Sequence, residues 1–381
     1  MDLVEGQFYL QCDDPAPVLE VKKQGADIEE RPFHKTDQAH RWLLRPMLPT
    51  DGAWDFRIRL SDGKYLAPEN HDHFRTLLTQ LWFQDNQIFG YKPAEEVETS
   101  QVRRIDGFNG SLPSRSLYVY LPRGYDAHPD KGYPVIYMHD GQNVFETFVD
   151  DSYAGSWQAD LVADRLIRQG QLPECIIVGV SHGNEARIQE YLPPYSRHPM
   201  PKREGKGTQW VQGMADQTAV YYMEDVALYI HESFRVKNGR EFIATCGSSM
   251  GGLFSLYLAW EHSNFARNHA AMSPSIWTTK QRSGKFDILE RLKQSNSPDI
   301  RLWLDSGQFA SNGQGEDGQV ETVVASEILL DNGFVDGENL QHYFDRGADH
   351  SERAWAGRLH KVFKYLFPMR QFYATALREN L

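Results

Sequence analysis

The first part of the chain, residues 1 to about 95, alternates apolar and polar residues with the period of β-strands. In Trp54–Leu60, every second residue is apolar and the residues between them include three charged ones. Turn-forming residues lie on both sides, at Asp51–Gly52 and Ser61–Lys64. No long helical period occurs before residue 95. The pattern predicts a small antiparallel β-sandwich over residues 1–95.

A different pattern follows a polar stretch at Tyr91–Glu96, where we place a linker. Short apolar runs then alternate with helix-length amphipathic segments. This alternation is typical of a mostly parallel sheet covered by helices, and predicts an α/β domain over residues 96–381. The predicted strands are Leu117–Leu121, Val135–Met138, Cys175–Val180, Phe242–Cys246, His269–Met272, Ile300–Leu304 and Gln341–Phe344, and the predicted helices include 219–235, 250–261 and 351–366.

Residues 193–217 fit neither pattern. They contain four prolines, three glycines and the basic cluster Lys202–Lys206. A loop this long inside a compact domain is usually functional or disordered. Two interpretations stay open: a solvated insertion, or a flap over an active site.

The strongest chemical signal is the segment Gly247–Gly251, which has the form G-x-S-x-G. A match of five residues is common by chance, but here a β-prone run precedes it and a helix-forming run follows it. The pattern predicts that Ser249 is a nucleophile on a tight strand-to-helix turn. The amide of Met250, at the start of the helix, is the expected first oxyanion donor. The alternative is that Ser248 or Ser249 only caps the helix.

A serine nucleophile needs a base, and in α/β-hydrolases the order along the chain is serine, acid, histidine. His350 lies between the last predicted strand and the C-terminal helix, which suits a general base. His342 falls within a predicted strand and His360 within a predicted helix, so both are weaker candidates.

The acid is expected in the loop that follows the strand Ile300–Leu304, where three carboxylates compete. Asp317 is favoured, although a carboxylate near the start of a helix is also common for structural reasons. Glu316 and Asp305 remain alternatives. Asp305 adjoins the strand and could instead hold the loop through local hydrogen bonds.

A second oxyanion donor is expected in the turn after the strand Val135–Met138. Gly141 permits a close backbone approach there, and the amide of Gln142 is the candidate donor. We expect His139, at the strand end, to support this loop rather than to react.

The run Cys246–Leu253, with Ser273–Trp277 downstream, resembles the esterase branch of the α/β-hydrolases. That branch includes enterochelin esterases, S-formylglutathione hydrolases, feruloyl and acetyl-xylan esterases, and mycolyltransferases. Further similar segments bring the resemblance to residues 100–368. They are Tyr137–Gln142, Ser156–Trp157, Ile176–Val180 and Gly347–Trp355.

The resemblance implies that Ser249 and His350 are catalytic. It also implies that the amides of Gln142 and Met250 form the oxyanion hole. We expect Trp157 and Trp277, which lie in the similar segments, to bind substrate. The acid loop departs from the family pattern, because the positions where the acid is often found are Ala310, Ser311 and Asn312. The N-terminal module is similar in layout to that of enterochelin esterases, or to a carbohydrate-binding sandwich. Aromatic residues that could form a sugar platform, but that we expect mostly in the core, are Trp42, Trp54, Tyr65 and Trp82.

Composition narrows the picture further. A net charge of −12 and a pI of about 5.6 give no footprint of nucleic-acid binding. No apolar run is long enough for a transmembrane helix, and no signal sequence is recognisable. The three cysteines, Cys12, Cys175 and Cys246, do not form a disulfide framework, so we expect a cytoplasmic protein.

The sequence therefore predicts a serine carboxylic ester hydrolase that acts on a small-molecule ester through an acyl-enzyme, without a metal or an organic cofactor. A narrower hypothesis is a ferric-siderophore esterase, in which Lys202, Arg203, Lys206 and arginines of the N-terminal module attract an anionic chelate. A third is a non-catalytic binding protein with a decayed hydrolase core. The oligomeric state cannot be inferred from the sequence.

Overall fold

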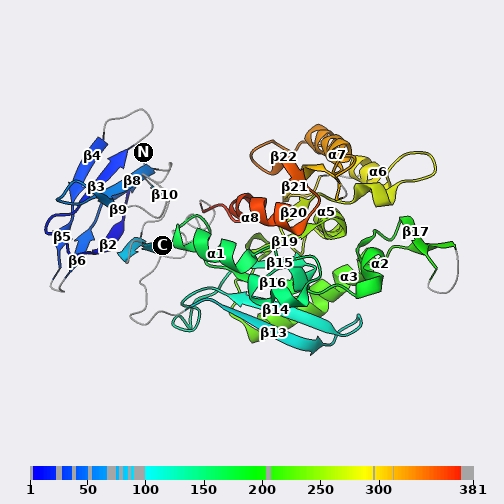
Figure 1. The fold of residues 1–381 in the computed structure, drawn as a ribbon, viewed down its shortest axis with the longest axis horizontal. Helices are drawn as coiled ribbons and strands as arrows, with labels where there is room; N and C mark the ends of the chain where they lie inside the picture. Colours follow the sequence, from blue (N-terminus) through cyan, green and yellow to red (C-terminus); the bar gives the residue numbers. More distant parts are fainter. Residues whose placement is uncertain are drawn as a thin grey trace. The chain divides into compact units, whose positions relative to one another are not determined.

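The computed structural model describes residues 3–22, 28–36, 40–49, 54–66, 74–76, 80–84, 87–89, 99–202, 207–294, 297–311 and 313–369 (Figure 1). The chain forms two compact units, residues 1–99 with 163–174 and 367–381, and residues 100–162 with 175–366. The linker expected at Tyr91–Glu96 and residues 203–206 of the basic cluster lie outside the described residues.

Within residues 1–99 of the first unit, the described regular structure consists of β-strands. Its described strands are β1 (Leu3–Glu5), β2 (Gln7–Gln11), β3 (Val18–Lys22), β4 (Ile28–Pro32), β5 (His34–Lys35), β6 (Arg41–Leu44), β7 (Met47–Pro49), β8 (Trp54–Arg59), β9 (Tyr65–Leu66), β10 (Phe74–Thr76), β11 (Gln80–Gln84) and β12 (Gln87–Phe89). They form one sheet in the order β10-β8-β3-β4 with β9 on β8, another in the order β12-β11-β2-β6-β5, and a β1-β7 ladder.

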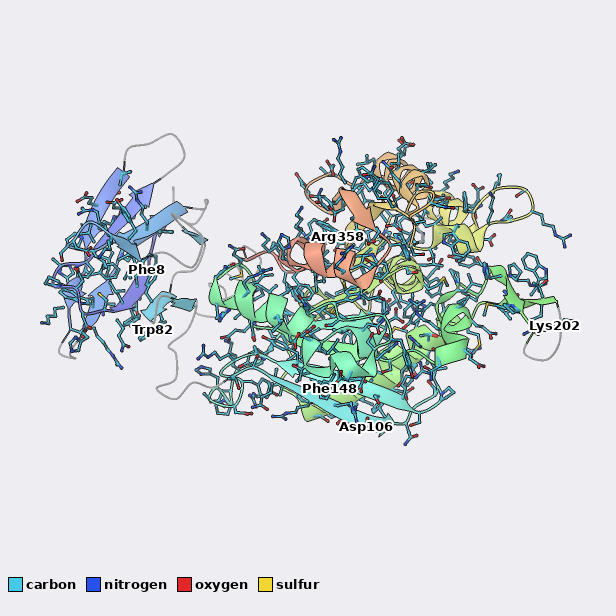
Figure 2. All side chains as sticks on the ribbon, viewed as in Figure 1. Phe8, Trp82, Asp106, Phe148, Lys202 and Arg358 are labelled. Carbon is cyan, nitrogen blue, oxygen red and sulfur yellow. The ribbon has the colours of Figure 1, made fainter. Side chains whose placement is uncertain are left out.

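Alternate residues of the two larger sheets form one apolar core (Figure 2). Phe8 of β2 and Phe56 of β8 meet there with ring centroids 5.4 Å apart. Trp42 is part of this core, as expected, whereas Tyr65 is partly exposed and lies over the Arg57 guanidinium. The expected fully antiparallel pairing is wrong at one place, because β11 runs parallel to β2. A long connection joins these strands, and such a connection permits parallel pairing where a hairpin does not.

The second unit holds an eight-stranded sheet among its described residues, in the order β13-β14-β16-β15-β19-β20-β21-β22. The strands are β13 (Gln101–Phe108), β14 (Arg115–Leu121), β15 (Val135–His139), β16 (Ile176–Val180), β19 (Ile243–Ser248), β20 (Asn268–Met272), β21 (Arg301–Phe309) and β22 (Leu340–Asp349). β14 is antiparallel to β13 and β16. The other neighbours in this sheet, β16-β15-β19-β20-β21-β22, run parallel to one another. This confirms the predicted α/β-hydrolase type of sheet.

Helices cover this sheet. Those within the second unit are α2 (Arg187–Tyr191), α3 (Ala215–Val220), α4 (Ala227–Ser233), α5 (Met250–Glu261), α6 (Asp287–Gln294), α7 (Gln319–Asp331) and α8 (Glu352–Leu366), whereas α1 (Ala159–Arg168) begins among residues of the second unit and ends among residues of the first. Shorter helical turns are η1 (Gly141–Asn143), η2 (Glu146–Asp151), η3 (Asn184–Ala186), η5 (Arg240–Phe242), η6 (Ile276–Thr279) and the π-helical η4 (Tyr221–Val226). The helix predicted over 219–235 is thus divided among α3, η4 and α4. Helix α5 is buried on all sides, which is why it is apolar all round.

The structure corrects several predicted boundaries. β21 continues past Leu304 to Phe309, so Asp305 lies inside the strand and not in the loop after it. The strand tolerates this buried carboxylate because an arginine on α8 neutralises it. The edge strand β13 was not predicted, since its exposed residues lack an apolar run. The stretch 193–217 contains an antiparallel hairpin, β17 (Arg197–Pro201) and β18 (Thr208–Gln212), with Lys202 at its end (Figure 2). No helix among the described residues has the length and apolarity needed to cross a bilayer.

Candidate active site

Most of the predicted site residues follow adjacent parallel strands at one edge of the large sheet. Gln142 follows β15, Ser249 follows β19 and His350 follows β22. Between them lie the segments after β20 and β21. Because the carboxyl ends of parallel strands meet at the same edge of a sheet, the topology gathers these segments into one region.

Ser249 occupies a strained turn between β19 and α5. Its backbone has φ 57° and ψ −122°, a conformation that costs a non-glycine residue about 1–3 kcal/mol. A Cβ atom at Gly247 would lie 2.4 Å from the His139 ring and 2.7 Å from the Gly251 carbonyl carbon. The first glycine of the motif is therefore required by packing, and the strain at Ser249 is held by the elements around it.

The side chain of His139 packs against Gly247 and supports this turn. Its Nδ1 is 2.9 Å from the Tyr222 hydroxyl and its Nε2 is 2.9 Å from Ser255 Oγ on α5. Burial lowers the pKa of His139 to about 3, so the imidazole is neutral near pH 7. The expectation of a supporting role agrees with these contacts, but the partners lie on η4 and α5 and not in the following loop.

The buried imidazole predicts an acid sensitivity of definite sign. The unfolded chain takes up this proton near pH 6.5, whereas the folded protein takes it up only near pH 3. Stability therefore falls as the pH falls through this window, by about 1.4 kcal/mol per pH unit. We expect His139→Gln to lower stability at pH 7 but to reduce the slope of the unfolding free energy between pH 6.5 and 4.5 by about one proton. Urea unfolding across this range measures the slope, and an unchanged slope would contradict the assignment.

His350 and Asp317 are brought together. His350 Nδ1 lies within hydrogen-bond distance of Asp317 Oδ1. The other carboxylate oxygen, Oδ2, accepts the Ser273 hydroxyl at 2.6 Å and the Gly307 amide at 2.7 Å. The His350 ring packs edge-on against Trp355 with centroids 4.9 Å apart. These contacts fix the Nδ1 side of the imidazole and do not involve Nε2.

The two rival acids lie in other surroundings. Asp305 is fully buried and receives the Arg358 guanidinium through two hydrogen bonds of 2.9 and 3.0 Å. Glu316 is exposed, and its side chain accepts the Val320 amide at the start of α7. Asp305 thus serves a buried ion pair and Glu316 serves as a helix cap, which leaves Asp317 as the carboxylate beside the histidine.

The Ser249 hydroxyl lies 3.2 Å from Ser275 Oγ. Two backbone hydrogen bonds hold this region, from Ser249 N–H to Met272 O at 3.0 Å and from Ser275 N–H to Ser249 O at 2.9 Å. Among the hydrogen bonds of the described residues, none joins Ser249 to His350. Catalytic hydrogen bonds are often long in ligand-free enzymes and tighten when substrate binds.

The loop after β15 approaches the neighbouring strand backbone to backbone. A Cβ atom at Gly141 would lie 2.5 Å from the Gly179 carbonyl carbon, so only glycine fits. Asp140, the residue before Gly141, is buried and receives two 2.7 Å hydrogen bonds from Arg187. Burial opposes ionisation, but the Arg187 charge holds the pKa of Asp140 below its ordinary value. The ion pair neutralises the negative charge of Asp140 beside this loop.

Residues 113–366, about two thirds of the chain, match the family model described as "Putative esterase". The chain belongs to this family. It is similar to the ferri-bacillibactin esterase BesA of Bacillus subtilis, with 25% identity over 227 residues, 58% of this chain and 74% of BesA. The match confirms the predicted family and a serine ester hydrolase.

Solved structures share the fold of this esterase. A ferulic acid esterase of Anaeromyces mucronatus has a TM-score of 0.52 and 21% identity, and the match covers 73% of this chain and 94% of that one. The enterobactin esterase FES of Shigella flexneri has a TM-score of 0.50 and 13% identity, over 93% of this chain and 88% of that one. The predicted fold class is thus confirmed.

The two substrate-binding candidates of this esterase differ in exposure. Trp277 on η6 is 55% exposed and lies two residues beyond Ser275. The His198 ring of β17 packs edge-on against it, with centroids 5.4 Å apart. Trp157 is only 2% exposed and packs against Trp355, the residue behind His350. A buried ring offers little surface to a substrate, so contact of Trp157 with substrate stays a prediction that its burial does not favour.

Three residues beside the site of this esterase were not singled out from the sequence. Ser273 and Ser275 follow β20, and Arg358 lies on the buried face of α8. The two serines could have been found from topology, because β20 ends between the strands that lead to the predicted serine and acid. An arginine among the apolar positions of the helix after His350 was the signal for Arg358.

Proposed function

We propose that Ser249, His350 and Asp317 form the catalytic triad of this esterase. His350 Nε2 takes the Ser249 proton while Oγ attacks the ester carbonyl carbon. The collapse of the tetrahedral intermediate breaks the acyl–oxygen bond, and the same proton passes to the leaving alcohol. Water then repeats the sequence, releases the carboxylic acid and restores the serine. Asp317 orients the imidazole and stabilises its cation throughout.

One observation carries this proposal. The carboxylate of Asp317 is bonded to His350 at the sheet edge to which the strained turn delivers Ser249. A helix cap needs neither a positive φ nor a histidine–carboxylate pair beside it. The paired acid also supports a working site over the decayed hydrolase core that the ambiguous acid loop had suggested.

The amides of Gln142 and Met250 are the proposed oxyanion donors. Met250 is the first residue of α5, where backbone N–H groups have no acceptor within the helix. Gln142 lies in η1, at the end of the neighbouring strand β15. Each donor of this kind contributes about 3 kcal/mol to the stability of the transition state.

Trp277 is the proposed substrate contact. Its exposed ring stands close in sequence to Ser275, which touches the nucleophile. The hairpin β17–β18 is tied to the same segment through His198, whose Nδ1 is 3.3 Å from the Thr278 carbonyl oxygen. This supports the flap interpretation of residues 193–217 over that of a detached insertion. An aromatic wall of this kind suits an aromatic acyl or catechol group.

A ferric-siderophore ester is the proposed substrate class. The similarity to BesA favours it. The predicted attraction by arginines of the first unit is weakened, because Arg57 and Arg59 both bind the buried Glu20 carboxylate. Lys202 remains as an exposed cation on the hairpin.

A panel of esters tests this assignment. We expect the purified protein to hydrolyse a catechol trilactone, with and without iron, at a higher kcat/KM than nitrophenyl acetate or methyl ferulate. Trp277→Ala should raise KM for the trilactone more than for nitrophenyl acetate, and Trp210→Ala, at an exposed tryptophan on β18, is the control. Faster turnover of methyl ferulate than of the trilactone would reject the siderophore assignment and leave the triad in place.

We also propose a cytoplasmic location, supported by three cysteines that are all free.

A further inference from the structure

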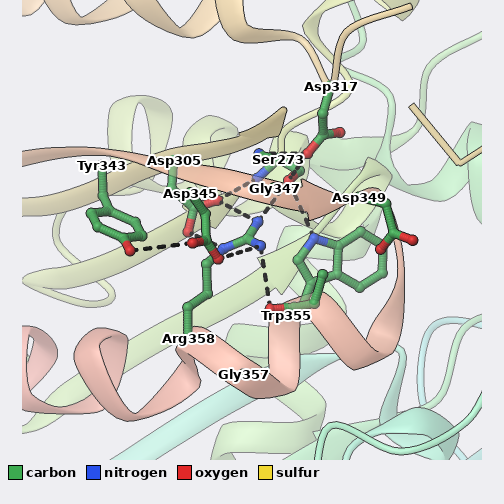
Figure 3. A network of polar contacts seen from close by, with 12 residues as sticks. Ser273, Asp305, Asp317, Tyr343, Asp345, Gly347, Asp349, Trp355, Gly357 and Arg358 are labelled. Atoms are coloured by element: carbon green, nitrogen blue, oxygen red, sulfur yellow. Dashed lines mark hydrogen bonds and ion pairs between the residues drawn. The ribbon is translucent and has the colours of Figure 1, made fainter. Parts of the chain in front are cut away.

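Behind Asp317 lies a hydrogen-bonded chain that the triad itself does not use (Figure 3). Its centre is Ser273, a buried residue with a positive φ of 39° at the end of β20. Its hydroxyl lies 2.8 Å from Arg358 Nη2, 3.2 Å from Trp355 Nε1 and 2.6 Å from Asp317 Oδ2. This one hydroxyl therefore joins α8 to the proposed catalytic acid.

The direction of these hydrogen bonds follows from the groups involved. A hydroxyl has one proton and two lone pairs, whereas a guanidinium and an indole N–H can only donate. Arg358 and Trp355 therefore fill the lone pairs of Ser273 Oγ. The single proton must point at Asp317, which can accept it only on a carboxylate oxygen.

Arg358 is a buried cation held in a fixed position. It is 1% exposed, and two of its nitrogens bind Asp305 on β21. Burial opposes its charge, but Asp305 raises the pKa of Arg358 above its ordinary value. The same Nη2 atom that binds Asp305 also binds Ser273, so the positive charge lies one hydroxyl away from Asp317.

We propose that Ser273 is a positioning residue for the catalytic acid, and that Arg358 orients it. We call the hydrogen-bonded chain from Arg358 through Ser273 to Asp317 the relay. The relay keeps Oδ2 of Asp317 occupied, which turns Oδ1 toward His350. It also draws part of the carboxylate charge away from the imidazole. This inference rests on the proposed triad and adds to it the group that sets the acid's direction. The charged and titratable groups around Ser273, Arg358 and His350 include Asp305, Asp345, Asp349, Glu352, Asp140, Arg187 and His342.

Loss of the hydroxyl has two expected consequences. Asp317 loses one of its two fixed contacts on Oδ2, and a misplaced acid lowers kcat for Ser273→Ala by about 10- to 100-fold with little change in KM. Where the carboxylate still faces His350, it keeps the negative charge that the Ser273 proton had drawn away, and this charge stabilises the imidazole cation. The acidic limb of the kcat/KM profile, which reports the base, therefore moves to higher pH.

The chain offers a matched control. Ser306 lies on β21 beside Asp305, and its buried hydroxyl has no hydrogen-bond partner within the described part of the chain. Ser306→Ala removes the same atom from the same region and should leave kcat and the pH profile at wild-type values. Ser273→Gly serves as a second variant, because glycine adopts a positive φ without strain.

The deciding experiment measures nitrophenyl acetate hydrolysis against pH for wild type, Ser273→Ala, Ser273→Gly and Ser306→Ala, and repeats Ser273→Ala in an Asp317→Asn background. Positioning through the acid predicts that the second substitution costs little once Asp317 is gone. Two results would overturn the relay: an equal loss of kcat in both backgrounds, or a pH profile of Ser273→Ala like that of Ser306→Ala. Neither result would overturn the triad if the wild-type protein is active. A wild-type protein without esterase activity or fluorophosphonate labelling would overturn both.

Discussion

Ser249→Ala should lower kcat for ester hydrolysis by about 10⁴-fold or more, because the attacking oxygen is removed and the remaining histidine has no proton to accept. The substitution leaves the rest of the site in place. We expect substrate binding to persist and the unfolding free energy to stay equal or to rise, since a strained turn loses only a hydroxyl. Hydrolysis of nitrophenyl acetate and urea unfolding measure the two effects.

Ser248 supplies the control for this substitution. It is the neighbouring serine, buried at the end of β19, and it was the other candidate for a merely structural role. Ser248→Ala should therefore retain kcat within a few-fold of wild type. If Ser249→Ala turned over substrate as fast as Ser248→Ala, the nucleophile would have to be sought elsewhere.

Asp317→Asn should lower kcat by about 10⁴-fold with little change in KM. The amide that replaces the carboxylate can donate to His350 Nδ1, which would place the proton of the neutral imidazole on Nε2, where a base needs a lone pair. If the amide nitrogen turned toward Ser273 and Gly307 instead, its own protons would face the protons of these two donors. Steady-state kinetics with nitrophenyl acetate separates kcat from KM.

Substitutions of the two rival carboxylates, Glu316 and Asp305, separate effects on activity from effects on stability. Glu316→Gln should keep full activity, because the amide oxygen still accepts the Val320 N–H. Asp305→Asn should instead lower the unfolding free energy by about 3–5 kcal/mol, because the buried Arg358 loses its counter-charge. A variant of Glu316 with the kinetic defect assigned to Asp317 would contradict the choice of acid.

The elements that carry apolar periodicity could be predicted from the sequence, and the polar core could not. β15, β16, β19 and β20 fall within a residue or two of their expected limits, because each is a short buried run. β21 was underestimated by several residues. Its continuation depends on the ion pair between Asp305 and Arg358, two residues that lie far apart along the chain.

The candidate site shows the same division. Ser249 could be located from local sequence, since strand, glycines and helix together specify the turn. The choice of Asp317 over Glu316 and Asp305 could be favoured but not decided, because it depends on which carboxylate reaches a histidine in another loop. Ser273 lies in a segment that carries the family resemblance, but nothing local shows its role, which arises only where the end of β20, the loop before α7 and helix α8 meet.

Reaction with a fluorophosphonate probe tests the central claim most directly, because the reagent phosphonylates a serine only where a base activates it and an oxyanion hole receives the developing charge. We predict one adduct per chain in the intact mass, mapped to the peptide that contains Ser249, absent in Ser249→Ala and strongly slowed in His350→Ala. Rapid labelling of another serine, or the same labelling rate without His350, would contradict the account.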